Sequence, residues 1–195
     1  MIKIVNIKQG LFFGLLNLDE FSIAEKLTQK REIETAGKYY LLKHLLGEQA
    51  QINYTNNGKP YLVNDLRHIS ISHSYNKLVI IINEHEPTGI DIEIIRDKIL
   101  NIKHKFLSNS ELNDAGNDIE KLLIYWSAKE TLYKLYGEPI VDFATHFSIN
   151  PFSKQNFGTV IACIGSLTKK QTLKLNYQIL ENYVLVYALQ QHNQC

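Results

Sequence analysis

Two carboxylates alternate with isoleucines in the segment Gly89-Ile90-Asp91-Ile92-Glu93-Ile94. Side chains of a β-strand point to alternate faces, so Asp91 and Glu93 would share one face, roughly 6.6 Å apart along the strand, with the isoleucines facing a core. Two carboxylates so close repel each other unless a cation lies between them. Mg²⁺ is usually held by one or two carboxylates and substrate phosphates. A strand with a solvated acidic face explains the same residues without a metal, and this segment alone favours that interpretation.

A second segment runs from Trp126 to Lys134 and reads Trp-Ser-Ala-Lys-Glu-Thr-Leu-Tyr-Lys. On a helix, Trp126, Glu130 and Lys134 are four residues apart and share a face. A carboxylate and a lysine beside a metal-bound phosphate would suit phosphoryl-type chemistry, because the metal neutralises charge and the lysine steadies the leaving phosphate. The structural alternative is an exposed Glu–Lys pair that stabilises the helix by about 0.2–0.5 kcal/mol.

A third set of polar residues comprises the turn Gly58-Lys59-Pro60 and the segment 69–74, Ile-Ser-Ile-Ser-His-Ser. Lys59, Ser72 and His73 could hold phosphates. A solvated turn and a hydrogen-bonded histidine at a strand end are the structural alternatives. We reject a catalytic triad of Ser72, His73 and Asp91, because adjacent strand residues point to opposite faces and no nucleophile-elbow glycines flank the serines.

The elements that carry these residues follow from hydrophobic periodicity and turn signals. Gly47 and Gly137 stand at helix C-terminal cap positions. We predict helices over residues 22–46, 99–106 and 119–136, and strands over residues 2–7, 51–54, 61–63, 68–72, 78–82 and 90–94 and within 147–190. The expected fold class is α+β.

Both halves of the chain place a helix before several strands, and short stretches repeat. Leu41-Leu42-Lys43 precedes Gly47 as Leu132-Tyr133-Lys134 precedes Gly137. A duplicated unit, with halves at 1–95 and 96–195, explains this order. A chance likeness between two α+β halves explains it equally well.

Composition sets the class of protein. The chain has 195 residues, 45% hydrophobic and 21% charged, with a net charge of +1. Such a balance fits a globular protein and favours neither nucleic acid nor an anionic membrane as partner. Cys163 and Cys195 offer neither metal spacing nor a disulfide framework, which favours a reducing cytoplasm. The N-terminus does not look like a signal peptide, and no apolar run is long enough to span a bilayer.

Taken in order, these motifs and Phe106-Leu107-Ser108-x-x-Glu111 resemble the single-chain, pseudodimeric 4'-phosphopantetheinyl transferases of bacteria, over about residues 30–140. The resemblance implies a duplicated α+β fold with the active site in a cleft between the halves, where the pyrophosphate of coenzyme A lies on Mg²⁺. It also implies roles for particular residues: metal ligands Asp91, Glu93 and Glu130; a phosphate contact from Lys134; and coenzyme A contacts from Lys30, Arg31, Lys38, Lys59, Pro60, Ser72 and His73.

The implied reaction is attack by a serine hydroxyl of an apo carrier protein, acyl or peptidyl, on the β-phosphorus of coenzyme A. The leaving group is 3',5'-adenosine bisphosphate. The serine needs a base, and Glu111 is the candidate, with Glu130 acting through its metal as the alternative. Ser108-x-x-Glu111 is also a helix capping box, and both roles are compatible.

Two rival functions remain, a metal-dependent nuclease and a non-catalytic carrier-binding module. The near-neutral charge argues against the first, and the retained carboxylates with Lys134 argue against the second.

A duplicated chain would work as a monomer. Carriers of this family are generally acidic, so we expect a basic docking patch; a solvated helix side is the alternative explanation of the cluster Arg96, Lys98, Lys103, His104 and Lys105.

Overall fold

The computed structural model describes residues 2–138, 142–165 and 171–191, apart from the side chains of residues 190 and 191. Contacts within the chain divide it into two units, Met1–Ile92 and Glu93–Cys195. Both units combine helices with antiparallel sheet, so the predicted α+β class is confirmed. No helix in the described ranges is long and apolar enough to cross a membrane.

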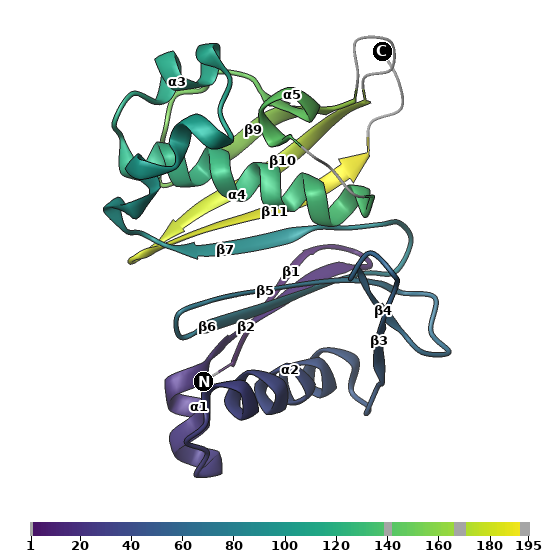
Figure 1. Cartoon of the computed structure of the whole chain (residues 1–195). Helices are drawn as coiled ribbons and strands as arrows, with labels where there is room; N and C mark the ends of the chain where they lie inside the picture. Colours follow the sequence, from purple (N-terminus) through teal and green to yellow (C-terminus); the bar gives the residue numbers. More distant parts are fainter. Residues whose placement is uncertain (1, 139–141, 166–170, 192–195) are drawn as a thin grey trace. The chain divides into compact units, whose positions relative to one another are not determined.

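The first unit is an antiparallel sheet with two helices packed on one face (Figure 1). Its strands lie in the order β1 (Ile2–Lys8), β2 (Leu11–Asn17), β6 (Lys77–Asn83) and β5 (His68–Ser74). The helices are α1 (Leu18–Glu25) and α2 (Lys30–Leu46), and a short hairpin, β3 (Ile52–Tyr54) and β4 (Pro60–Leu62), follows α2. Apolar side chains such as Leu16, Leu41 and Ile80 fill the space between α2 and the sheet.

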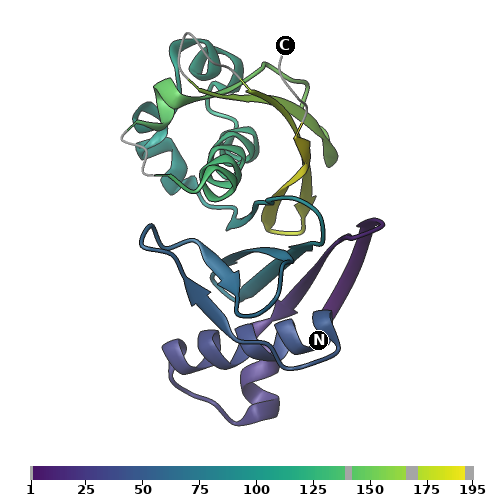
Figure 2. The same cartoon turned by 90° about the vertical axis from the view of Figure 1, so that its right-hand side faces the viewer.

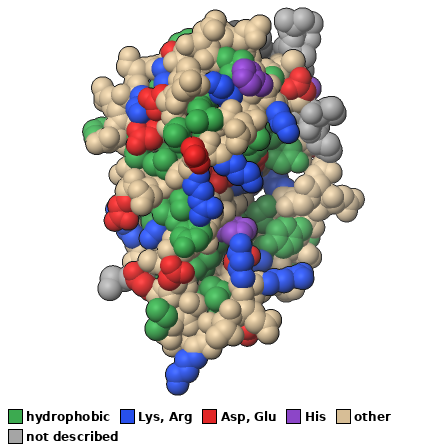
Figure 3. All heavy atoms as spheres, turned by 60° about the vertical axis from the view of Figure 1, so that its left-hand side comes forward, with side chains coloured by type: hydrophobic (Ala, Val, Ile, Leu, Met, Phe, Trp, Pro, Cys, Tyr) green, Lys and Arg blue, Asp and Glu red, His purple; other side chains and the backbone are tan. Residues whose placement is uncertain are grey.

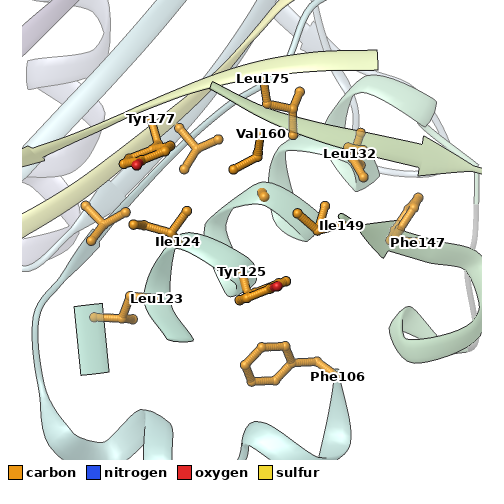
Figure 4. Packing of buried hydrophobic residues seen from close by; sticks show 14 of the residues in the cluster. Phe106, Leu123, Ile124, Tyr125, Leu132, Phe147, Ile149, Val160, Leu175 and Tyr177 are labelled. Atoms are coloured by element: carbon orange, nitrogen blue, oxygen red, sulfur yellow. The ribbon is translucent and has the colours of Figure 1, made fainter. Parts of the chain in front are cut away.

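The second unit packs one long helix, α4 (Ile119–Tyr136), against a curved sheet (Figure 2). The strands lie in the order β7 (Ile90–Ile94), β11 (Tyr183–Gln191), β10 (Gln171–Leu180), β9 (Phe157–Ile164) and β8 (Phe147–Ile149). Figure 4 shows Ile124 and Leu132 of α4 among Val160 and Leu175 of the strands. The shorter helices are η1 (Asp97–Asn101), η2 (Lys103–Lys105), α3 (Asn109–Ala115) and α5 (Phe143–His146).

The single helix predicted over residues 22–46 is wrong, because two helices occupy this part of the chain. Asn17 begins α1, its side chain accepting from the backbone N–H of Asp19 and Glu20, and the helix ends at Lys26 in the left-handed conformation (φ 55°). An N-cap asparagine followed by acids was a readable signal for this start. The strand β2 before it was also missed.

The α-helix predicted over residues 99–106 is wrong as well. The segment forms two short 3₁₀ helices, η1 and η2, that bury Ile99 and lead to the buried Phe106. Other boundaries agree closely with the predictions. The helix over 119–136 and its glycine cap at Gly137 are confirmed, as is the cap at Gly47.

Both units contain a long helix that ends at a left-handed glycine and a later hairpin with a two-residue turn. In the first unit the turn is Tyr75-Asn76 with Tyr75 at φ 53°, and in the second it is Glu181-Asn182 with Glu181 at φ 50°. A duplicated unit would produce such matching details. The duplication itself, with halves at 1–95 and 96–195, stays a prediction.

Lys26→Gly should raise the free energy of unfolding by about 1 kcal/mol, because glycine adopts the left-handed conformation without the steric cost that lysine has there. The melting temperature should rise by about 2–4 °C. Glu25→Gly is the control; it lies inside the helix and should lower stability by about 1 kcal/mol. Equal losses in the two variants would show that the Lys26 conformation is not strained.

Candidate active site

Asp91 and Glu93 project from β7, the strand with alternating carboxylates. Ile90 and Ile92 are buried, as the alternation predicts. Asp91 is buried too, at 3% exposure, and its Oδ1 accepts a hydrogen bond from Ser72 Oγ at 2.8 Å. Glu93 is partly exposed. The interpretation of this segment as a solvated acidic face is therefore wrong for Asp91.

Helix α4 presents a partly exposed stripe on a largely buried helix. Trp126, Glu130 and Lys134 lie on this stripe, one turn apart, whereas Ala128 and Lys129 are buried. The helix face on which we predicted Glu130 and Lys134 to act is thus partly exposed. It brings Glu130 and Lys134 together on α4, as the spacing required.

Trp126 joins this stripe to β7. Its indole Nε1 donates a hydrogen bond to Glu93 Oε1 at 3.1 Å. Phe106 and Phe143 flank the indole, with ring centroids 5.0 and 5.9 Å away, and so limit its rotation. Glu93 therefore lies beside the helix face that carries Glu130. Sequence reasoning placed Trp126 on this face but gave it no role, since nothing in the spacing relates it to β7.

The donor chemistry of these residues suits a hard divalent cation. Asp91, Glu93 and Glu130 offer only carboxylate oxygens, the ligand type that Mg²⁺ prefers. Among residues 2–138, 142–165 and 171–191, no three His, Cys, Asp or Glu side chains gather closely enough to form a metal cluster by themselves. Mg²⁺ sites often need only one or two protein carboxylates, because phosphates and water complete the shell. Asp91 and Glu93, two residues apart on β7, offer carboxylate oxygens of that type.

Two of the predicted coenzyme A residues meet around a glutamate that sequence reasoning missed. His73 Nε2 lies 3.4 Å from Glu34 Oε1, and Lys30 Nζ lies 3.8 Å from the same oxygen. The four-residue spacing of Lys30 and Glu34 could have predicted their ion pair on α2. No local spacing predicts the contact of Glu34 with His73 of β5. Arg31, next to Lys30, is exposed.

The remaining predicted coenzyme A residues lie around the β3–β4 hairpin. Lys38 Nζ donates to the Tyr54 hydroxyl at 2.9 Å and lies over the rings of Tyr39 and Tyr54, 5.3 and 5.4 Å from their centroids. Lys59 follows the hairpin turn, and Pro60 begins β4. Lys38 therefore links α2 to the β3–β4 hairpin through its contacts with Tyr54.

Lys59 and His73, two of the predicted coenzyme A residues, are associated with opposite ends of β5. Burial lowers the pKa of His68, at the start of β5, and the charge of Lys59 acts in the same direction. His73 lies five residues further on, about 16 Å along an extended strand. The structure therefore brings Lys30 together with His73, whereas the charge of Lys59 acts on His68 at the start of β5.

The side chain of Ser72 lies apart from that of His73. Its hydroxyl donates to Asp91 and accepts from the backbone N–H of Ile92, whereas the next residue, His73, approaches Glu34 of α2. Adjacent strand residues point to opposite faces, which explains the separation. The same alternation was our reason for rejecting a triad of Ser72, His73 and Asp91.

Glu111 forms the predicted capping box of α3 and also a buried ion pair. Its side chain is 2% exposed and its Oε2 accepts from Ser108 N–H and from Lys129 Nζ, each at 2.8 Å. Its Oε1 accepts from Ile149 N–H at 2.9 Å. Both oxygens are thus engaged inside the protein, which favours the structural role over that of a catalytic base.

Lys129, the other member of the pair, is wholly buried. Its ammonium group also donates to the carbonyl oxygens of Phe106 and Phe143, at 2.7 and 3.2 Å. Burial lowers the pKa of Lys129, and the negative charge of Glu111 opposes that decrease. The lysine of the Lys-Glu dipeptide in this helix is therefore a core residue, and only its neighbour Glu130 is accessible.

Glu111→Gln should lower the free energy of unfolding by about 3–5 kcal/mol, because Lys129 would stay buried without an opposite charge. Urea unfolding followed by the fluorescence of the single tryptophan measures this. Glu120→Gln is the control; it removes a partner of the partly exposed Lys154 and should cost less than about 1 kcal/mol. An unchanged stability with a rate of transfer lowered about a hundredfold would restore Glu111 as the base.

A family model described as the 4'-phosphopantetheinyl transferase superfamily matches residues 87–188, a little over half of the chain. No curated protein matches the chain. The matched range includes the carboxylates of β7, the capping-box glutamate and the whole of α4, and the predicted coenzyme A residues before β7 precede it. The chain belongs to the 4'-phosphopantetheinyl transferase superfamily.

Proposed function

We propose that the protein transfers the 4'-phosphopantetheine group of coenzyme A to a serine of an apo acyl or peptidyl carrier protein, with Mg²⁺ bound. The observation that carries the proposal is the position of Glu93, which shares β7 with Asp91 and is hydrogen-bonded to Trp126 on the helix face of Glu130. This arrangement lies within the range that matches the superfamily. A cation held there would neutralise the negative charge of the pyrophosphate.

The residues of the chain have separate tasks in this reaction. The carrier serine oxygen forms a bond to the β-phosphorus, the bond from that phosphorus to the bridging oxygen breaks, and 3',5'-adenosine bisphosphate leaves with the bonding electrons. Asp91, Glu93 and Glu130 would hold the cation, and Lys134 would offer positive charge to the phosphates. Lys30, Arg31, Lys38, Lys59 and His73 are the proposed contacts of the nucleotide end.

The proton of the serine hydroxyl needs an acceptor. We assign the role of proton acceptor to Glu130, which is partly exposed on α4. Glu111 is less suited to this role, because both of its oxygens accept hydrogen bonds within the core. A carboxylate in this position would take the proton directly or through water. The role of Glu111 is then to hold Lys129 and α3.

Mixed charge on the surface supports a small anionic substrate over a nucleic acid. On the face drawn in Figure 3, Lys and Arg side chains are interspersed with Asp and Glu. The net charge of +1 agrees with this. Nucleic-acid binding relies on many phosphate contacts with a basic surface.

The wild-type protein, apo carrier protein, coenzyme A and Mg²⁺ should yield phosphopantetheinylated carrier, detected by its mass. Asp91→Asn and Glu130→Gln should each lower the rate by about a hundredfold or more, because each removes charge that balances the reacting phosphates. Asp97→Asn and Glu120→Gln are matched controls, in η1 after β7 and in the first turn of α4. Full activity in EDTA would contradict the metal assignment. Cleavage of plain DNA with Mg²⁺ and no transfer would favour the nuclease.

We further propose that the carrier docks on the basic segment after β7. Lys98, His104 and Lys105 are exposed. Lys103 instead donates hydrogen bonds to Gly116 O and Asn117 Oδ1, at 2.8 and 2.6 Å, and so stabilises the loop after α3. The helix that we predicted over residues 99–106 would have given these side chains a regular face, but the segment forms two 3₁₀ helices. Charge without a regular face still attracts an acidic partner.

Lys98→Glu with Lys105→Glu should lower kcat/KM for the carrier severalfold through slower association, with the affinity for coenzyme A unchanged. Added salt should reduce the wild-type rate, since exposed charges are screened over about 10 Å at 0.1 M ionic strength. Lys26→Glu with Lys174→Glu, two exposed lysines elsewhere in the chain, is the control. Equal kcat/KM in the two double variants at low salt would rule out this docking surface.

A further inference from the structure

Two buried serines of β5 connect this strand to β7 through their side chains. Ser70 Oγ accepts a hydrogen bond from Ile90 N–H at 3.2 Å, and Ser72 Oγ accepts one from Ile92 N–H at 3.3 Å. Both serines are buried, at 3% and 7% exposure. Their hydroxyls supply the acceptors that buried backbone N–H groups require. The two residues are thus alike in strand, face, burial and backbone contact.

Only Ser72 makes a second contact. Its hydroxyl donates to Asp91 Oδ1 at 2.8 Å, within hydrogen-bond geometry. A serine hydroxyl has one proton to donate, and here that proton lies toward the carboxylate. The hydroxyl oxygen accepts a hydrogen bond from Ile92 N–H and the hydroxyl donates one to Asp91, so two hydrogen bonds fix its orientation. The carboxylate it holds is 3% exposed.

We propose that Ser72 is a positioning residue that holds the Asp91 carboxylate for the divalent cation, and that it is not a ligand of the nucleotide phosphates. The proposal rests on the proposed function, in which Asp91 binds that cation. Hydrogen bonds to ligating carboxylates fix their orientation and raise metal affinity. A carboxylate oxygen that accepts one hydrogen bond keeps a lone pair, so the contact leaves Asp91 able to bind a metal.

The alternative role for Ser72, a contact with a phosphate of coenzyme A, conflicts with this geometry. Donation to a phosphate would require the hydroxyl to release Asp91, leaving a buried carboxylate without that donor. The neighbouring His73 is on the opposite side of the strand, toward Glu34. The two residues therefore do not offer donors to one phosphate group from a shared face.

The test compares Ser72→Ala with Ser70→Ala. Each variant removes the acceptor of one β7 N–H group, and only the first removes the donor to Asp91. Mn²⁺ binding is followed by electron paramagnetic resonance with coenzyme A saturating and no carrier, so that no turnover occurs. Ser72→Ala should weaken Mn²⁺ binding by about 10–100-fold, the usual effect of losing such a partner, and Ser70→Ala should leave it unchanged.

A second measurement separates positioning from phosphate binding. The KM for coenzyme A is compared with that for dephospho-coenzyme A, which lacks the 3'-phosphate. If Ser72 acts on Asp91, Ser72→Ala should leave the ratio of the two constants as in wild type, and Ser72→Thr, which keeps the hydroxyl, should restore Mn²⁺ affinity. Unchanged Mn²⁺ affinity together with an altered ratio would overturn the proposal and make Ser72 a phosphate ligand.

Folding and the proposed function are checked separately. Should Ser72→Ala fail to fold, Ser72→Cys keeps a similar shape with a weaker donor, and Mn²⁺ affinity equal to wild type in that variant would contradict positioning.

Asp91→Asn is the reference for loss of the ligand itself. A wild-type protein that binds no Mn²⁺ with coenzyme A present would overturn the metal assignment and the positioning role together. Wild-type binding with equal affinity in Ser70→Ala and Ser72→Ala would overturn the positioning role alone.

Discussion

The buried pair of Glu111 and Lys129 is the interaction on which the second unit depends. Removing two charges from water costs several kcal/mol per ion, so a buried pair persists only where further hydrogen bonds satisfy it. Here those bonds come from the start of α3, from β8 and from the carbonyl groups of Phe106 and Phe143. Two stretches of the chain, residues 106–111 and 143–149, therefore converge with Lys129 of α4 on this one ion pair.

This convergence also determines which way α4 faces. A helix turns about 100° per residue, so a lysine directed into the core leaves its neighbour on another side. Lys129 is wholly buried and Glu130 is partly exposed, on the stripe that Trp126 and Lys134 share. The indole of Trp126 then meets Glu93 at the edge of that stripe. The adjacent Lys-Glu dipeptide thus combines a structural anchor with an accessible carboxylate.

Local signals predicted much of this, and contacts between distant residues account for what they missed. Gly137 and the periodicity of α4 gave its limits, and Ser108-x-x-Glu111 gave its capping box. The break at Lys26 was missed because no glycine or proline marks it. The burial of Asp91 and its hydrogen bond with Ser72 were missed because the two residues are 19 positions apart in sequence. The partner of Glu111 was missed for the same reason, since no helical or strand spacing relates it to Lys129, 18 residues away.

Strand β7 belongs to both units, since the first ends at Ile92 and the second begins at Glu93. Asp91 and Glu93 are therefore assigned to different units although only one residue separates them. Along an extended strand the two residues are about 6.6 Å apart, so the boundary between the units divides this pair of acids. A hybrid enzyme built from the halves of two relatives should accordingly be joined before Thr88 or after Ile95, so that both acids come from one parent.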